Sequence, residues 1–216
     1  MAEKGQEKDR ISPERAAEIE ELEKMLDPKR GLDLQVIKTF DELEENFCII
    51  LMENVSNYNV VNTRVAKYFV DKGMKGVYVT INKGLDELAD MFKAEEIAMD
   101  GILFIDAITK MSRGNEVAGN NYTYLDSPKD LLNLSVAIET AMAKLGSEKR
   151  FIIIDSLTTL LVYSKPGAVE KFVHMMAEKT KTGNAAGIFI LMDSTEKNVT
   201  STLAQFCDKV VELQVI

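Results

Sequence analysis

Tryptophan is absent from this sequence of 216 residues, histidine occurs once and cysteine only twice. The single histidine, His174, leaves little room for a Ser-His-Asp triad, and the sequence contains no G-x-S-x-G segment. Cys48 and Cys207 lie far apart and form no CxxC motif, which argues against a disulfide framework and against a zinc site. No apolar run approaches the ~20 residues that span a bilayer, and the charged N-terminal residues lack the apolar centre of a secretory signal. We therefore expect a cytoplasmic protein without a membrane segment.

Positive charge is also scarce. The sequence has 26 Lys and Arg against 35 Asp and Glu, which gives a formal net charge of −9 and a pI near 4.8. Proteins that bind nucleic acid need a basic face for the phosphates, so this balance makes nucleic acid an unlikely partner and opposes a DNA recombinase. The excess of negative charge is concentrated in residues 1–45, which contain 8 basic and 14 acidic residues and so have a net charge of −6. We interpret residues 1–45 as an acidic N-terminal helical segment and residues 46–216 as one α/β domain.

The N-terminal segment contains a short pattern of helical spacing. Ser12 and Pro13 form an N-cap and first-turn pair, and Pro28 and Gly31 are expected to end the helix. The apolar positions between them are Ile19, Leu22, Met25 and Leu26. This stripe is too short for a coiled coil. Two interpretations stay open: a solvated acidic arm, which charge runs usually are, or a helix that docks on its own domain or on a partner.

Apolar runs of strand length alternate with segments of helical periodicity along the rest of the chain. Continuous apolar strands are typical of a parallel sheet that is buried on both faces, and the alternation predicts helices on both sides of it. The last strand alternates apolar and polar residues and is expected at the edge of the sheet. The expected strands are 47–52, 77–81, 102–105, 151–154, 188–192 and 211–215, and the expected helices are 40–45, 61–72, 85–92, 131–145, 169–182 and 200–206.

The polar stretch 109–127 has no periodicity and is expected to be a long loop, either functional or mobile. Tyr122 and Tyr124 in this stretch could stack on a base or on a partner, although loop aromatics without such a role are nearly as common.

Ligands bind at the carboxyl ends of the strands in sheets of this kind. Asp106, Asp155 and Asp193 each follow an expected strand. Carboxylates at one edge of a sheet could bind a cation, but aspartate at strand ends is also common turn chemistry. Both interpretations stay open from the sequence.

Two segments carry a resemblance to a known family. Residues 72–80 read KGMKGVYVT, and residues 151–161 read FIIIDSLTTLL. With the strand at 102–105, they resemble the RecA-like ATPases of the KaiC type over residues 46–216. The resemblance implies a RecA-like three-layer α/β/α sandwich with a mostly parallel central sheet. It also implies ATP and Mg²⁺ as cofactors, with Asp155 as the Walker B residue that holds magnesium.

The phosphate loop of that family reads G-x-x-x-x-G-K-[ST], and residues 56–63, SNYNVVNT, stand at the equivalent place. Only Thr63 matches, because Ser56 and Val61 replace the glycines and Asn62 replaces the lysine. Glycine lets successive N–H groups turn toward phosphate. A charged hydrogen bond contributes about 1.5–3 kcal/mol, and a non-glycine residue in the left-handed region costs about 1–2 kcal/mol. The loss of one lysine and of one or two backbone positions together costs on the order of 4–7 kcal/mol, or ~10³- to 10⁵-fold in affinity.

Two hypotheses follow. The first is a non-catalytic domain with an eroded nucleotide site, which acts as a binding or regulatory module for a protein partner or for a second copy of itself. Residues 11–26 and the last strand are then the candidate interfaces. No catalytic residue is assigned, because KaiC-like ATPases carry a water-activating glutamate where this sequence has Asn82-Lys83-Gly84.

The second hypothesis is an ATP-binding protein or ATP hydrolase with an atypical phosphate loop. In that case Thr63 and Asp155 would hold Mg²⁺. The full set of nucleotide-binding residues would be Ser56, Asn57, Asn59, Asn62, Thr63 and Asp155.

Overall fold

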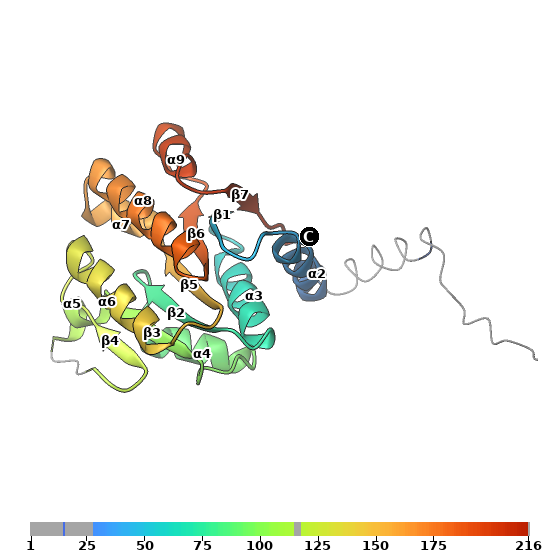
Figure 1. The fold of residues 1–216 in the computed structure, drawn as a ribbon, viewed down its shortest axis with the longest axis horizontal. Helices are drawn as coiled ribbons and strands as arrows, with labels where there is room; N and C mark the ends of the chain where they lie inside the picture. Colours follow the sequence, from blue (N-terminus) through green and yellow to red (C-terminus); the bar gives the residue numbers. More distant parts are fainter. Residues whose placement is uncertain (1–14, 16–27, 115–117, 216) are drawn as a thin grey trace, which may run out of the picture.

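The computed structural model describes residues 15, 28–114 and 118–215. Strands and helices alternate along these residues, as the sequence predicts (Figure 1). The strands are β1 (Phe47–Glu53), β2 (Lys75–Thr80), β3 (Ile102–Asp106), β4 (Tyr122–Tyr124), β5 (Arg150–Asp155), β6 (Ala185–Met192) and β7 (Lys209–Glu212). The helices are α2 (Pro28–Asp41), α3 (Tyr58–Asp71), α4 (Leu85–Ala94), α5 (Thr109–Arg113), α6 (Leu131–Lys144), α7 (Leu157–Tyr163), α8 (Pro166–Thr182) and α9 (Lys197–Ala204).

The strands form one seven-stranded sheet in the order β4-β3-β2-β5-β6-β1-β7, and neighbouring strands pair in parallel throughout. The interior strands β1, β5 and β6 are buried over nearly their whole length, which explains their unbroken apolar sequences. The expected edge position of the last strand is confirmed, since β7 pairs with β1 alone and buries Val211 while Val210 is exposed. The predicted α/β fold class with a parallel central sheet is therefore confirmed.

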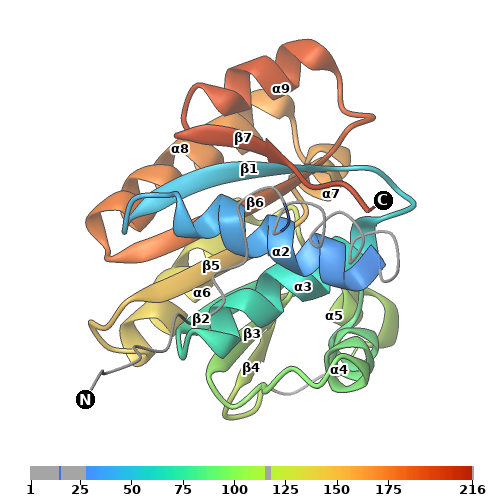
Figure 2. The same ribbon diagram turned by 90° about the vertical axis from the view of Figure 1, so that its right-hand side faces the viewer.

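Helices cover both faces of the sheet, which gives three layers (Figures 1 and 2). On one face, α2, α3 and α4 contribute Phe40, Phe69 and Phe92 to a core that also contains Phe151 of β5. On the other face, α6, α7, α8 and α9 pack against alternate strand residues, with Phe172 near the centre of that core. Because side chains alternate along a strand, each buried strand supplies both cores.

The N-terminal predictions need correction where the structure describes them. The helix expected at 40–45 is wrong, since α2 ends at Asp41 and Thr39 lies inside it. Gly31 does not end a helix but lies in the first turn of α2. Leu32, Val36 and Phe40 recur at intervals of one helical turn and are buried in the core, and this burial places α2 on the domain.

The helix expected over residues 12–26 lies outside the described residues apart from Arg15, which is helical and exposed. The division of the chain at residue 45 stays a prediction.

Three further elements were not predicted, namely α5, β4 and α7. The stretch 109–127, expected to be a loop, contains α5 and the short edge strand β4. β4 has only three residues, so its sequence offers no alternation that could reveal it. α7 follows β5 directly and begins at the N-cap Ser156, whose hydroxyl accepts a hydrogen bond from the amide of Thr159.

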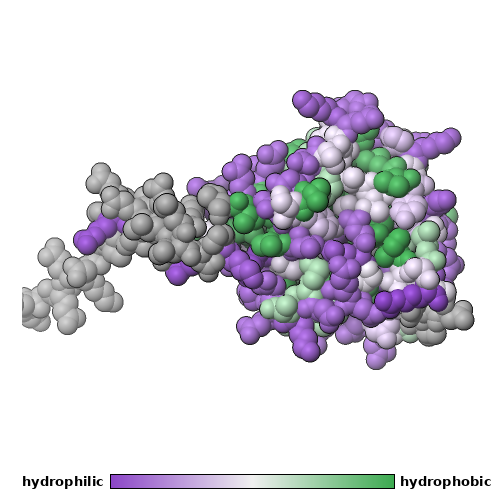
Figure 3. Space-filling view, turned by 180° about the vertical axis from the view of Figure 1, so that it is seen from behind, coloured by the Kyte–Doolittle hydropathy of each residue, from purple (hydrophilic) through white to green (hydrophobic). Residues whose placement is uncertain are grey.

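The surface has no continuous apolar face in the view of Figure 3, where hydrophobic side chains form separate patches among hydrophilic ones. Within residues 28–114 and 118–215, no helix combines the length and the apolar composition that crossing a membrane requires.

One close contact between β2 and β5 yields a testable prediction. A Cβ atom at Gly76 would overlap the ring of Phe151, which stacks on Phe69 and has no room to move aside. Gly76→Ala is expected to lower the free energy of unfolding by about 1–3 kcal/mol through overpacking, measured by urea denaturation. Gly167→Ala is the matched control, because nothing lies within 4 Å of a Cβ at that position in α8. Equal stability of the two variants would contradict the packing described.

Candidate functional site

The carboxyl ends of the parallel strands meet at one edge of the sheet, where polar side chains gather. β1 ends at Glu53, β2 at Thr80, β3 at Asp106 and β5 at Asp155. All four of these side chains are buried. Burying polar groups is unfavourable unless they form hydrogen bonds. The partners of these four side chains therefore determine whether this edge of the sheet can bind a cation or a nucleotide.

Asp155 is the centre of a hydrogen-bonded cluster that we name the Asp155 cluster, consisting of Tyr58, Asn62, Tyr78, Asn82 and Asp155. The hydroxyl of Tyr58 donates to Oδ1 of Asp155, and the hydroxyl of Tyr78 donates to Oδ2 at 2.8 Å. The amide of Asn82 lies 3.4 Å from Oδ1, and the amide of Asn62 lies 3.5 Å from Oδ2. Both carboxylate oxygens are therefore contacted by side chains of the protein.

Asn82 connects this cluster to the start of α7. Its amide donates to the Tyr58 hydroxyl at 2.6 Å and to the Ser156 hydroxyl at 3.2 Å, and its side-chain oxygen accepts from the Thr159 hydroxyl. Residues from β2, α3, β5 and α7 are thus joined in one network, in which a shift of one side chain changes the partners of the others.

Glu53 lies at the end of β1 with both carboxylate oxygens buried and without a hydrogen-bond partner among the described residues. Burial, together with the nearby charge of Asp155, raises the pKa of Glu53 to about 9. Burial also raises the pKa of Asp155 to about 8, although donors contact both of its oxygens. At neutral pH Glu53 and Asp155 therefore favour the protonated form, which is uncharged and attracts a cation only weakly.

The residues expected to form a phosphate loop lie mostly in a helix. Residues 54–57 connect β1 to α3, and α3 begins at Tyr58. Asn54 organises the connection, because its side-chain oxygen accepts from the Ser56 hydroxyl at 2.8 Å and from the Asn57 amide at 3.0 Å. No residue of this described stretch has a left-handed φ.

The other predicted residues lie in the first two turns of α3. Asn59 is exposed, whereas Asn62 and Thr63 are buried. The hydroxyl of Thr63 donates to the carbonyls of Asn59 and Val60, both at 3.0 Å, so it is bonded to its own helix. Of the predicted nucleotide-binding residues, the structure brings together Asn62 and Asp155, and it keeps Ser56, Asn57 and Asn59 outside their cluster.

The remaining strand-end aspartates do not join Asp155 in a cation site. Asp106 accepts hydrogen bonds from the amides of Leu85, Ile108 and Thr109 and from the Thr109 hydroxyl, which is turn chemistry. Asp193 is exposed. Within the described part of the chain, no group of three or more His, Cys, Asp or Glu side chains is placed to hold a metal ion.

His174 lies on an exposed face of α8, and its ring stacks on Phe206. The sequence did not identify Glu53, Tyr58 or Tyr78 as residues of the site, and it identified Asn82 only as the replacement of the family's glutamate. Glu53 ends an apolar run, which is a usable signal for a buried carboxyl group, whereas nothing in the local pattern links either tyrosine to Asp155.

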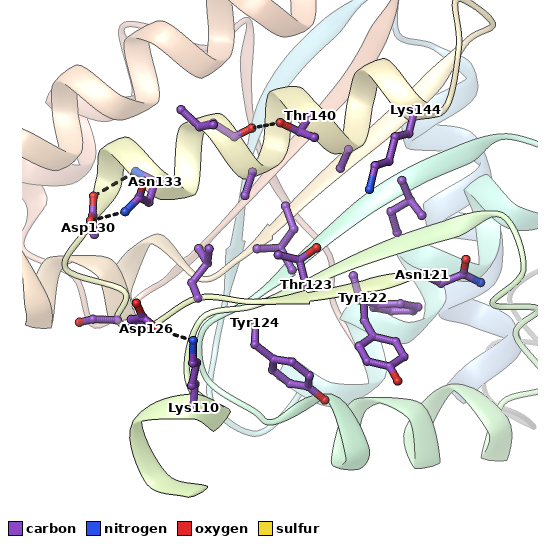
Figure 4. A pocket seen from close by; sticks show the side chains of 18 of the residues that line it. Lys110, Asn121, Tyr122, Thr123, Tyr124, Asp126, Asp130, Asn133, Thr140 and Lys144 are labelled. Atoms are coloured by element: carbon purple, nitrogen blue, oxygen red, sulfur yellow. Dashed lines mark hydrogen bonds and ion pairs between the residues drawn. The ribbon is translucent and has the colours of Figure 1, made fainter. Parts of the chain in front are cut away.

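A second feature is a groove of about 390 Å³ between the edge strand β4 and α6 (Figure 4). Thr123 of β4 points toward α6, while the rings of Tyr122 and Tyr124 point away from it. An ion pair between Lys110 and Asp126, at 2.5 Å, lies at one end of the groove, and Lys144 lies near the other. The groove therefore combines charged ends with an open edge strand.

Solved structures share this fold. An uncharacterized protein from Pyrococcus horikoshii, PH0321, crystallised in complex with an unknown peptide, is similar with a TM-score of 0.64 and 9% identity, over 82% of this chain and 81% of that one. The KaiC-like protein PH0186 from Pyrococcus horikoshii OT3 gives a TM-score of 0.58 and 11% identity over 80% and 75% of the two chains. The flagellar accessory protein FlaH from Methanocaldococcus jannaschii gives 0.54 and 13% over 78% and 70%.

These likenesses establish the RecA-like, KaiC-like fold that the sequence resemblance implied. No curated protein matches the sequence. A family model matches residues 69–213. These residues include β2, β3, Asp155 and most of the core between the sheet and helices α6, α7, α8 and α9. The chain therefore belongs to this family, the family of unknown function DUF7504.

Proposed function

We propose that this chain is a non-catalytic RecA-like domain that binds a protein partner, and that side chains of the protein occupy the place of the nucleotide. The observation that carries the proposal is the Asp155 cluster. A Walker B aspartate needs a free carboxylate oxygen for the magnesium shell, whereas both oxygens of Asp155 accept hydrogen bonds from tyrosine hydroxyls. Magnesium is usually bound by one or two carboxylates plus substrate phosphates.

The start of α3 supports the same conclusion. A phosphate cradle needs several backbone N–H groups that are free to point at oxygen atoms. The N–H of Val61 instead donates to the carbonyl of Asn57 at 3.0 Å, as in any helix. The position of the family's lysine is held by Asn62, which is neutral and buried. The residues present therefore do not fit a magnesium-bound triphosphate.

The position of the water-activating glutamate supports a non-catalytic domain as well. Asn82 stands there and is bonded within the Asp155 cluster, and the adjacent Lys83 forms an ion pair with Glu87 at 2.7 Å. A protonated lysine cannot accept a proton from water. The chain thus lacks a general base at this end of β2.

The binding part of the proposal rests on the open edge of the sheet. The groove beside β4 offers backbone groups of an edge strand and charged ends, a combination that suits a polypeptide. The similar structure of PH0321 contains an unknown peptide, which supports peptide binding by proteins of this fold. A second copy of this chain is the alternative partner.

One observation favours the second hypothesis, an ATP-binding protein with an atypical loop. Oδ1 of Asn62 and both oxygens of Glu53 are buried without a hydrogen-bond partner among the described residues. Unpartnered oxygens beside Asp155 are potential ligands of a cation that arrives with a nucleotide.

Calorimetry with Mg-ATP separates the two hypotheses. The wild-type protein is expected to give no binding heat at micromolar nucleotide, because the expected loss of affinity moves the dissociation constant into the millimolar range. Asp155→Asn is the matched variant, which keeps the shape of the side chain and removes its charge. A dissociation constant below roughly 50 µM in the wild type that is lost in Asp155→Asn would overturn the proposal.

A further inference from the structure

The structure brings the two cysteines together, although they lie 159 positions apart in the sequence. Cys48 is the second residue of β1, and Cys207 follows α9 just before the edge strand β7. Their sulfur atoms are 3.3 Å apart. Cys48 is completely buried, whereas Cys207 is partly exposed.

The backbone around the two sulfurs is fixed by hydrogen bonds in both directions. The amide of Asp208 donates to the carbonyl of Cys48 at 2.7 Å, and the amide of Cys48 donates to Oδ2 of Asp208 at 2.8 Å. Lys181 of α8 holds the other oxygen of Asp208 at 2.8 Å. These contacts keep the two cysteines adjacent, independently of any bond between them.

We propose that Cys48 and Cys207 form a reversible disulfide bond, which makes this pair a site of oxidative modification by low-molecular-weight disulfides. A disulfide requires a sulfur–sulfur distance of about 2.05 Å, so the two atoms must approach by little more than 1 Å. Because Cys48 is buried in β1 and Cys207 is partly exposed, we expect the Cys207 side chain to make this approach.

The reaction proceeds by two exchange steps. The Cys207 thiolate attacks one sulfur of the external disulfide, so that a mixed disulfide forms and one small thiolate leaves. Cys48 then attacks the Cys207 sulfur, and its proton passes to the second small thiolate, which leaves as a thiol. Two thiols of the protein are oxidised, the external disulfide is reduced to two thiols, and the two released protons end on those thiols.

Exposure decides which cysteine reacts first. Contact with the Cys207 thiol and burial raise the pKa of the Cys48 thiol far above its ordinary value. The thiolate is the nucleophile in this chemistry, so Cys48 does not start the exchange. Once Cys207 is in the mixed disulfide, its sulfur lies next to the Cys48 sulfur and is the electrophile of the second step.

The disulfide bond would link the interior strand β1 to the segment that precedes the edge strand β7. β7 pairs with β1 alone and connects to α9 through Cys207. A disulfide there closes a loop that contains most of the chain, and constraining long loops stabilises the folded state most in the chain-entropy model. The oxidised protein therefore holds β7 and α9 more firmly than the reduced protein does.

The test compares the reduced full-length protein with the same protein after incubation with oxidised glutathione. Titration of thiols under denaturing conditions is expected to fall from two groups to none, and the mass is expected to fall by about 2 Da. The melting temperature is expected to rise by about 5–10 °C, and dithiothreitol is expected to reverse all three changes. Cys207→Ser should accumulate no intramolecular bond and show no rise, and Cys207→Ala repeats this control with a different side chain.

Two outcomes would overturn the inference. The first is a stable glutathione adduct on Cys207 with Cys48 still reduced, since the distance between the sulfurs would then not permit the second exchange. The second is a disulfide-linked dimer as the main product, because it would mean that the exposed thiol meets another molecule before it meets Cys48.

Discussion

Replacing Glu53 with glutamine is expected to remove much of the loss of stability that the protein suffers as pH rises. The pKa of Glu53 is raised from 4.5 to about 9 in the folded protein. Between these values the unfolded chain releases the proton and the folded chain retains it, so stability falls as pH rises. The slope is about 1.4 kcal/mol per pH unit for one such group, and its full extent is at most about 6 kcal/mol. The stability due to the raised pKa is complete below the unfolded value and lost above the folded one.

Urea denaturation of wild type and Glu53→Gln from about pH 5 to about pH 9 measures this effect. The variant is expected to lose less stability over this range, while Asp155 keeps part of the slope because its pKa is raised in the same direction. Glu212→Gln is the matched control, since Glu212 ends the neighbouring strand β7 and is exposed. Parallel pH profiles of wild type and Glu53→Gln would show that Glu53 is not buried as described.

Truncation of Tyr78 is expected to have the second large effect. Tyr78 is completely buried, its ring meets that of Phe92 edge-on at 5.6 Å, and its hydroxyl donates to Asp155. Tyr78→Ala is expected to lower the free energy of unfolding by about 3–5 kcal/mol, as large aromatic truncations in cores do. The loss combines the cavity with the lost hydrogen bond to a carboxyl group.

Tyr78→Phe separates these two contributions, because it keeps the ring and removes the hydroxyl alone. Its expected loss is about 0.5–1.5 kcal/mol, the usual net value for a hydrogen bond between neutral groups, because the raised pKa keeps the Asp155 carboxyl group protonated near pH 6. Denaturant unfolding of both variants near pH 6 provides the measurement. If Tyr78→Phe were as stable as the wild type, the hydroxyl would contribute nothing to Asp155, and the Asp155 cluster would lose its main support as a structural feature.

Much of the fold was predictable because burial on both faces leaves a local signature. β1, β5 and β6 each appear as an apolar run, since every side chain of an interior strand contacts a core. The bounds of α2 were not predicted, because its few apolar core positions lie among charged and polar residues and form only a weak periodic pattern. These positions are Leu32, Val36 and Phe40. Strand β4 was missed because three residues cannot display a period.

For the site, the sequence predicted individual residues but not the contacts between them. The sequence identified Asp155 at a strand end and showed that glycine and lysine are missing from residues 56–63. It did not show that Tyr58 and Tyr78 bond to Asp155, because those residues lie 97 and 77 positions away. Such contacts depend on the order of strands in the sheet and on where α3 begins.

The class of fold, the edge position of the last strand and the absence of glycine and lysine from residues 56–63 could be read from residue type and local spacing. The meeting of side chains could be seen only in the folded chain. The fold places two tyrosines on Asp155, buries Glu53 without a hydrogen-bond partner among the described residues and sets Cys48 beside Cys207. The physical reason is that parallel pairing joins strands distant in the chain, so contacts across the sheet follow strand order and register rather than any periodicity along the sequence.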